Sequence, residues 1–280
     1  MSKARVLITG ACGYIGTHVV RAFLKRGFDV VACDLSLNDV PEQAHGLSVD
    51  IFDPSVSVYE LAGKPDYLVH LVWRNGFVHN APSHLSDLPL HLRFLESMVE
   101  AGVKNITVMG SMHEVGYWEG AITNDAPTNP QSYYAIAKNA LRQAMAVYLN
   151  GKDVNFHWVR GFYIYGDDEK NHSVLAKILE ADRAGKELFP FTSGKNLYDF
   201  ISVYELAEQI AAVSVQSEIC GIVNCCSGTP VSLGEMAQKF ISEHGLKIRL
   251  QYGAFPDRPY DSPGVWGDAS LIRQIMDAEK

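Results

Sequence analysis

Residues 5–16 read RVLITGACGYIG, a run of mostly apolar residues that passes into three glycines. This pattern predicts a buried strand that turns sharply into a helix, which we expect to begin near Tyr14. Gly10 permits the tight turn, Gly13 lets the backbone approach a pyrophosphate, and Gly16 lets the helix pack closely on the strand. A pyrophosphate would then bind the N–H groups at the helix N-terminus. The stretch therefore predicts a dinucleotide-binding βα unit.

An acidic residue, Asp34, ends the second predicted strand, DVVACD. A carboxylate at this place can accept both hydroxyls of an adenosine ribose and repels a 2′-phosphate, which favours NAD over NADP. The residues that follow include no Arg or Lys for a 2′-phosphate, although Ser36 suits either cofactor, so NADP stays open. Besides Asp34, the expected cofactor contacts in this region are Gly10, Cys12, Gly13, Tyr14, Ile15 and Gly16.

Five short apolar runs between residues 6 and 161 alternate with amphipathic segments. The runs are VLITG, DVVACD, YLVHLV, NITVMGS and NFHWVRG. Strands that alternate with helices predict an α/β fold with a Rossmann-type, doubly wound parallel sheet. We expect an NAD(P)-binding Rossmann domain over residues 1–166. The shorter, interleaved segments of residues 167–280, GIVNCC among them, predict a small C-terminal substrate-binding lobe that shares the sheet.

The 280-residue chain has the composition of a folded, acidic protein. With 47% hydrophobic and 20% charged residues, it can bury a large core. A formal net charge of −8 without a basic run argues against a nucleic-acid partner. No stretch approaches the roughly 20 apolar residues of a membrane helix, and we expect no signal peptide. Five cysteines without a CxxC pair fit a reducing cytoplasm, where we expect the protein to act.

Three histidines, His79, His84 and His91, lie close together in HNAPSHLSDLPLH. The two prolines predict a broken segment, in which these side chains do not share a helix face at i, i+4 spacing. We therefore expect no metal site.

Tyr134 and Lys138 stand four residues apart in SYYAIAKNALR, within a helix predicted from about Ser132 to Asn150. The spacing places both on one helix face, within reach of one bound molecule. Hydride transfer at a C–OH or C=O group needs a proton donor or acceptor at the oxygen, and a tyrosine with a pKa of about 10 is poorly suited to this. Lys138, together with the cationic nicotinamide of the oxidised cofactor, would stabilise the phenolate and so lower the pKa of Tyr134, and Lys138 would also hold the nicotinamide ribose. Both residues are thus predicted to be catalytic and to contact the cofactor.

Six motifs occur in an order that resembles the extended short-chain dehydrogenase/reductase family, in its nucleotide-sugar epimerase/dehydratase branch. They are TGACGYIG, HLVW, GSMHEVG, YAIAK, RGFYIYG and DFISVYELA, and they span nearly the whole chain. The resemblance implies an NAD(P)-dependent oxidoreductase that acts on a sugar or a nucleotide-sugar. It also implies a homodimer formed through the helix that carries Tyr134 and its neighbour, in a two-fold interface.

The family takes a third catalytic group from a Ser or Thr at the end of the strand that precedes the Tyr helix. In an ungapped register Gly116 ends the family's SSxxVYG element, and Ser111 is the third member. A second register, which matches EVG to the family's EVYG, would place Met112 there, and a Met side chain cannot donate a hydrogen bond. Ser111 is therefore the preferred residue.

The resemblance also implies further cofactor contacts at the adenine, at the ribose and at the carboxamide. These residues are, in turn, Asp50 with Ile51, Leu71 with Val72, and Phe162 with Tyr163.

Trp73 and Arg74 follow the predicted strand YLVHLV, at the edge where doubly wound folds bind ligands. Arg74 would bind a phosphate or a carboxylate. The expected substrate contacts are Trp73, Arg74, Met112, His113, Tyr163 and Arg258.

Two positions depart from the nucleotide-sugar members, which usually carry Asn at Tyr163 and Arg at Tyr198 to hold a diphosphate. Arg258 matches a diphosphate-binding Arg of the family, and Lys195 would partly replace the missing one.

A nucleotide-sugar 4-ketoreductase is the leading reaction class. Dehydratases that resemble this chain follow the catalytic Thr with Asp and Glu, where it has Met112 and His113, and epimerases are usually longer. Three alternatives stay open. A 4-epimerase is one. An NAD-dependent uronate or aldose dehydrogenase is the second, because SMHEVGYW and ACDLSLND resemble stretches of these enzymes, in which the His contacts a free sugar acid. A non-catalytic NAD(P)-binding regulator is the third, against which the presence of Tyr134 and Lys138 argues.

Overall fold

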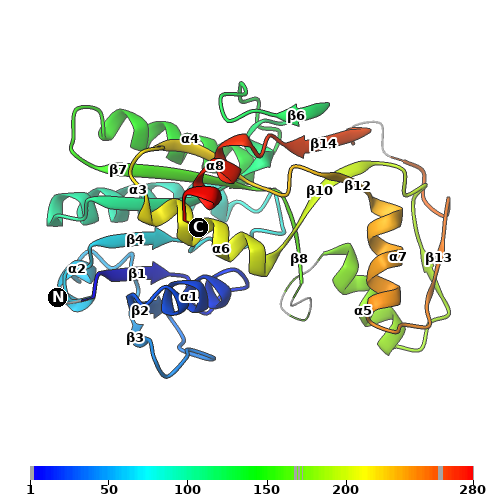
Figure 1. Cartoon of the computed structure of the whole chain (residues 1–280), viewed down its shortest axis with the longest axis horizontal. Coiled ribbons are helices and arrows are strands. Elements are labelled where there is room, and N and C mark those ends of the chain that lie inside the picture. Colours follow the sequence, from blue (N-terminus) through cyan, green and yellow to red (C-terminus); the bar gives the residue numbers. More distant parts are fainter. Residues whose placement is uncertain (1–2, 167–168, 170, 172, 258–260, 280) are drawn as a thin grey trace.

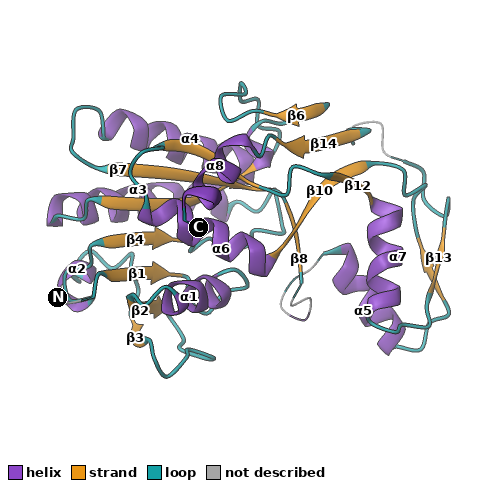
Figure 2. Cartoon of the chain, in the orientation of Figure 1, coloured by secondary structure: helices purple, strands orange, loops and turns teal. Residues whose placement is uncertain are grey.

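The computed structural model in Figures 1 and 2 describes residues 3–166, 169, 171, 173–257 and 261–279. Its main sheet has seven strands, and every neighbouring pair is parallel. Their order across the sheet is β11 (Gly221–Cys225), β7 (Asn155–Gly161), β5 (Asn105–Ser111), β4 (Tyr67–His70), β1 (Arg5–Thr9), β2 (Asp29–Asp34) and β3 (His45–Ser48).

The predicted apolar runs form six of these strands, with GIVNCC as β11, which confirms the fold class. In β1, Val6, Leu7 and Ile8 have no exposed surface, because helices cover both faces of the sheet. Strand β3 was not predicted. Its sequence HGLS holds one apolar residue, and an exposed strand at the edge of a sheet does not require an apolar run.

Helices cover the two faces of the main sheet in separate layers, as Figure 1 shows. One layer holds α1 (Gly16–Lys25), α6 (Val203–Val215) and α8 (Ser270–Ala278), and the other holds α2 (Val58–Leu61), α3 (Ser83–Ala101) and α4 (Tyr133–Tyr148). Successive residues of β1 serve opposite cores, with Ile8 under the first layer and Leu7 under the second. In the described part of the chain, no helix is long and apolar enough to cross a membrane.

Helix α3 runs without interruption through Pro89, so the predicted break in this segment is wrong. Pro82 lies just before the first turn, where no backbone N–H is needed. Pro89 costs about 3 kcal/mol through its missing N–H and its ring. Burial of His84, His91 and Leu95 on the inner face of the helix offsets this cost. Among the described residues, no group of three or more His, Cys, Asp or Glu side chains could hold a metal ion.

The chain after Gly166 contributes β11 to the main sheet, three strands to a second sheet and all of a lobe. The second sheet is ordered β12 (Pro230–Ser232), β10 (Leu197–Ser202), β14 (Gly264–Gly267) and β6 (Gly120–Ile122), with β8 (Tyr163–Tyr165) beside β10. The lobe holds α5 (Val174–Arg183), α7 (Leu233–Glu243), β9 (Leu188–Pro190) and β13 (Arg249–Gln251), and it lies beyond the carboxyl ends of the main strands, at the right of Figure 1. Buried Asp199 of β10 joins the second sheet to the segment that follows β11, because its carboxylate accepts backbone N–H bonds from Ser227, Gly228 and Gly267.

Candidate active site

The order of the main sheet reverses between β1 and β4, since the chain continues from β1 to β2 on one side and later to β4 on the other. At such a point the loops diverge and leave a crevice outside the carboxyl ends of the strands, where doubly wound folds bind ligands. Residues 10–15 follow β1 here, residues 71–75 follow β4, and Ser111 ends β5. Predicted site residues from separate parts of the sequence thus meet at one edge of the sheet.

The glycine loop is shaped by close contacts that exclude side chains. Gly10 has φ +71°, and a Cβ on it would lie 2.9 Å from the backbone N of Val72 and 3.1 Å from the carbonyl carbon of Leu71. A Cβ on Gly16 would lie 2.0 Å from the carbonyl oxygen of Gly10. Helix α1 begins at Gly16, two residues later than predicted, and no described side chain caps its N-terminus or adds an acid to its first turn. The loop therefore fits an anionic group of a dinucleotide at this helix end.

Asp34 lies beside the loop at the end of β2. Its carboxylate accepts the N–H of Cys12 at 3.0 Å and the N–H of Leu35 at 2.8 Å. These bonds fix the acid next to the glycine loop, in a position that fits a ribose. Asp50, by contrast, accepts the N–H of Phe52 at 2.9 Å and closes a turn, while Ile51 packs into the core.

Ser111, Tyr134 and Lys138 lie together at the carboxyl ends of β4 and β5. The hydroxyl of Ser111 lies near the phenol oxygen of Tyr134, where it favours the phenolate. Lys138, one turn further along α4, donates from Nζ to the carbonyl oxygen of Met109 at 2.6 Å and lies 3.8 Å from the centre of the Trp73 ring. The structure thus brings the three predicted catalytic side chains into one cluster.

Burial dominates the protonation of this cluster. It raises the pKa of Tyr134 to about 12, although the nearby hydroxyl of Ser111 opposes the shift and the charge of Glu114 adds to it. It lowers the pKa of Lys138 to about 7, against the charge of Glu114. In the chain by itself desolvation therefore sets the pKa of Tyr134, and the lowering by Lys138 together with the cationic nicotinamide stays a prediction for the complex with oxidised cofactor. Tyr134 is a protonated phenol at neutral pH.

Aromatic side chains surround Tyr134. The ring of His79 lies parallel to it, with 5.4 Å between centroids, and His113 lies 4.6 Å from His79. The rings of His84 and Trp73 each make an edge contact with the Tyr134 ring, with 5.3 and 6.2 Å between ring centroids. The loop between β4 and α3, which carries His79, is hydrogen-bonded to α4, because the backbone N–H of Tyr134 donates to the carbonyl oxygen of His79 at 2.9 Å. Sequence reasoning did not assign His79 or His84 to the site, although their place after a parallel strand was a signal.

Other predicted substrate residues have partners within the chain. Arg74 forms an ion pair with Asp87 of α3, so its guanidinium is already engaged. Met112 packs into the core under the first helix layer, on the opposite side from the cluster, which favours the register with Ser111. The rings of Tyr163 and Tyr198 lie 4.4 Å apart.

The remaining predicted residues divide between the core, the lobe and the undescribed part of the chain. Phe162 packs into the core of the first layer. Lys195 lines a separate cavity of about 520 Å³ beside the N-terminus of α7. Arg258 lies outside the described residues.

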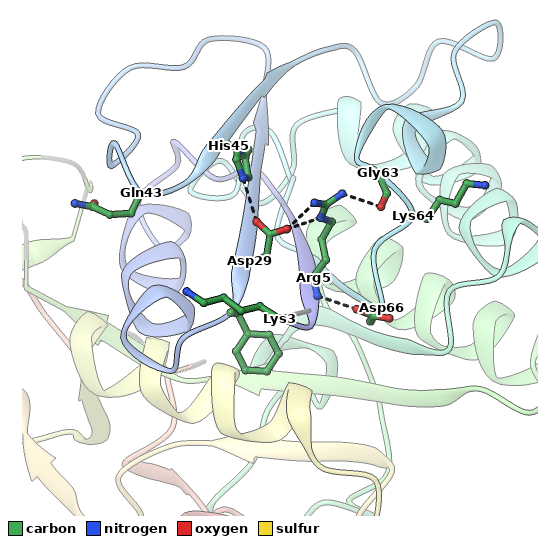
Figure 3. Close-up of a pocket in the computed structure, with 9 residues that line it drawn as sticks. Lys3, Arg5, Asp29, Gln43, His45, Gly63, Lys64 and Asp66 are labelled. Carbon is green, nitrogen blue, oxygen red and sulfur yellow. Dashed lines mark hydrogen bonds and ion pairs between the residues drawn. The ribbon is translucent and has the colours of Figure 1, made fainter. Parts of the chain in front are cut away.

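A further hollow of about 610 Å³ lies at the opposite, amino-terminal edge of the main sheet, as Figure 3 shows. Arg5 lies across it, paired with Asp29 and donating to the carbonyl oxygen of Gly63. The described residues that line this hollow include none of the predicted site residues, so it is separate from the crevice.

Comparison with known proteins gives matches over nearly the whole chain. The sequence profile of the NAD dependent epimerase/dehydratase family matches residues 6–226. The chain is 44% identical over 267 residues to dTDP-6-deoxy-L-talose 4-dehydrogenase (NAD(+)) of Aggregatibacter actinomycetemcomitans, covering 94% of this chain and 98% of that protein.

Two solved structures share the fold at lower identity. UDP-glucose 4-epimerase of Thermotoga maritima with UDP-glucose has a TM-score of 0.82 and 19% identity, covering 96% of this chain and 91% of that one. UDP-glucose 4-epimerase of Thermus thermophilus in complex with NAD has a TM-score of 0.80 and 21% identity, covering 98% and 93%. The range matched by the family profile contains the glycine loop, Asp34, Ser111, Tyr134 and Lys138. The chain therefore belongs to the NAD-dependent epimerase/dehydratase family of enzymes, as its six motifs predicted.

Proposed function

We propose that the protein is an NAD-dependent 4-ketoreductase of a nucleotide-linked 6-deoxyhexose, and a 4-dehydrogenase in the reverse direction. The observation that carries the proposal is the cluster of Ser111, Tyr134 and Lys138 beside the glycine loop. Support for the substrate comes from the 44% identical relative, which is named for 4-dehydrogenation of dTDP-6-deoxy-L-talose. We therefore expect dTDP as the nucleotide and C4 as the reacting carbon.

When bound, the nicotinamide supplies the hydride in reduction. Tyr134 donates a proton to the ketone oxygen, which hydride transfer would otherwise leave as an alkoxide. Ser111, which lies beside Tyr134, donates its hydroxyl hydrogen to the same ketone oxygen when substrate is bound. Lys138 stabilises the phenolate that remains and holds the nicotinamide ribose.

The protonation of the site supports the reducing direction. Because burial raises the pKa of Tyr134 to about 12, the phenol carries its proton at neutral pH and can give it up only as negative charge develops on the substrate. Burial also lowers the pKa of His113 to about 4. His113 is thus neutral and suited to hydrogen bonds with sugar hydroxyls.

The test is steady-state oxidation of NADH by the purified protein with a dTDP-4-keto-6-deoxyhexose. Turnover with this compound, and none with free galacturonate or glucuronate and NAD, is the expected result. Uronate-dependent reduction of NAD would replace the proposal with the sugar-acid dehydrogenase. The observation that favours that second candidate is His113, whose ring lies 6.3 Å from that of Tyr134. Interconversion of UDP-glucose and UDP-galactose without net loss of NADH would indicate an epimerase instead.

Replacing Asp34 by Ser is expected to raise KM for NADH by about 10-fold or more, because hydrogen bonds to a charged group contribute about 1.5–3 kcal/mol. KM for NADPH should fall in the same variant, since the carboxylate no longer repels a 2′-phosphate. Steady-state kinetics with both cofactors measure this. Asp153→Asn, at an exposed acid far from the crevice, is the matched control. If the ratio of KM for NADH to KM for NADPH is unchanged in Asp34→Ser, this acid does not bind the ribose.

The proposed assembly is a homodimer formed through α3 and α4. Three apolar side chains on these helices are exposed, Leu85 at 41%, Ile136 at 41% and Val147 at 78%. A two-fold axis would bring these side chains of both copies together and remove them from water. Sedimentation of the wild type is expected to give a dimer, and Ile136→Glu combined with Val147→Glu to give a monomer of unchanged helix content. A wild-type monomer at all concentrations would contradict the proposal.

A further inference from the structure

Glu114 lies three residues beyond Ser111, in the short 3₁₀ helix Met112–Glu114 that follows β5, and its side chain is fully buried. Its Oε1 accepts the backbone N–H of Ser111 at 2.7 Å, while the hydroxyl of Ser111 accepts the N–H of His113 at 3.3 Å. These two bonds hold the backbone on both sides of the Ser111 hydroxyl. The carboxylate is thus directly connected to a member of the catalytic cluster.

The space around this carboxylate is closely fitted. The indole N–H of Trp158 on β7 donates to both oxygens of Glu114, at 2.8 and 3.0 Å. Gly110 lies beneath them, and a Cβ at this position would lie 2.1 Å from Trp158 Nε1 and 2.8 Å from Glu114 Oε1. A side chain at Gly110 would therefore displace the bonds that reach Ser111.

Two arginines face the same carboxylate. The Nε atoms of Arg142 on α4 and Arg160 on β7 each lie 3.7 Å from Glu114 Oε2, and Arg160 has no exposed surface. The partners of Glu114 in the described chain are all donors, which suits an ionised carboxylate and not a carboxylic acid. Burial raises the pKa of Glu114, and Arg160, Ser111, Trp158 and Arg142 oppose that shift. A buried charge with this many donors costs more than an apolar residue would, so packing alone does not explain it.

We propose that Glu114 is a positioning residue for the reaction, which fixes Ser111 against Tyr134 and holds one negative charge behind the catalytic cluster. This rests on the proposed function for the reaction itself, but the geometry exists in the chain without substrate. The negative charge raises the pKa of Tyr134 and also that of Lys138. Arg142 and Arg160 partly balance this charge and so limit both effects.

Other titratable groups face the cluster from its neighbouring elements and stay the same in the variants below. His70 on β4 and His91 on α3 lie on the side of Lys138, and both are kept neutral because burial lowers their pKa. His79, His84 and His113 lie on the side of Tyr134.

Two variants test the proposal in opposite directions. Glu114→Gln keeps an acceptor for the backbone N–H of Ser111 but removes the negative charge. Arg142→Gln keeps the negative charge of Glu114 but removes one of the two positive charges that face it. The assay uses a dTDP-4-keto-6-deoxyhexose and NADH. Glu114→Gln is expected to lower kcat about 10-fold or more with little change in KM for NADH. It should also move the alkaline limb of the pH profile of kcat to lower pH by about one pH unit. Arg142→Gln should move that limb up. Glu119→Gln, at an exposed acid in the following loop, is the control.

A second measurement needs no substrate. Urea unfolding of the cofactor-free protein at a series of pH values reports the titration of Lys138, because burial lowers its pKa in the folded chain alone. The rise that Lys138 contributes to the unfolding free energy should begin at about pH 7 in the wild type, at a lower pH in Glu114→Gln and at a higher pH in Arg142→Gln. If both variants lose kcat while the pH profile and the pH dependence of unfolding stay unchanged, Glu114 has a structural role and the proposal is wrong. Unchanged kcat in Glu114→Gln would also overturn it. If the wild type turns over none of the substrates, the proposed function fails, but the unfolding series still decides whether Glu114 carries a negative charge beside Lys138. If Glu114→Gln does not fold, the shifts of the pH profile and of the unfolding series in Arg142→Gln test the proposal.

Discussion

Tyr134→Phe is expected to lower kcat for the 4-keto nucleotide-sugar by about 10³-fold, because the variant keeps the ring but has no proton to give to the ketone oxygen. Affinity for NADH should stay close to that of the wild type, since the ring that contacts His79, Trp73 and His84 is kept. Steady-state kinetics and fluorescence titration with NADH measure the two quantities.

Tyr133→Phe is the matched control for this variant, because Tyr133 lies next to Tyr134 but is 44% exposed. We expect it to retain kcat. A Tyr134→Phe protein with kcat within a few-fold of the wild type would remove Tyr134 from the proposed mechanism and would return the non-catalytic alternative to consideration.

Lys138→Met is expected to abolish turnover and to stabilise the cofactor-free protein at pH 6. Burial lowers the pKa of Lys138 to about 7, against about 10.4 in an unfolded chain. At about 1.4 kcal/mol for each unit, the charged form costs the folded state up to about 4–5 kcal/mol. Loss of the bond to Met109 and of the contact with Trp73 offsets part of this gain, so we expect a net stabilisation of about 3 kcal/mol.

The pH dependence gives a second readout of the same residue. Between about pH 7 and pH 10.4 the unfolded chain binds one proton more at Lys138 than the folded chain, so Lys138 makes the unfolding free energy rise with pH. The rise is measured between pH 7 and about pH 8.5, because above this range the buried thiols of Cys33, Cys225 and Cys226, whose pKa burial raises, oppose it. Lys138→Met should lack that rise, and Lys104→Met, at an exposed lysine, should keep it. If Lys138→Met is less stable than the wild type at pH 6, burial of the Lys138 ammonium does not lower the unfolding free energy and the prediction is wrong.

Features that lie on one element were predictable from spacing alone. The run from Arg5 to Gly16 contains a strand, a tight turn and a helix start, and each needs only its own residues in order. Tyr134 and Lys138 share a helix face through their spacing of four. Ser111 could be assigned because a strand end and a motif register agree at one residue.

Features that depend on neighbours were missed or mistaken. Strand β3 is held by its pairing with β2, and α3 continues through Pro89 because its inner face is buried. The pairing of β3 and the burial of α3 cannot be inferred from the residues of these elements alone. Glu114 was not assigned a role, since its partner Trp158 lies 44 residues away in the sequence.

Local spacing therefore predicted the fold class, the glycine loop and the shared helix face of Tyr134 and Lys138, because strand, turn and helix periodicity are short-range properties of the chain. Tertiary structure alone decided their protonation. The pKa of Tyr134 rises and that of Lys138 falls because each side chain is desolvated beside Glu114, and the elements that bury them come from distant parts of the chain.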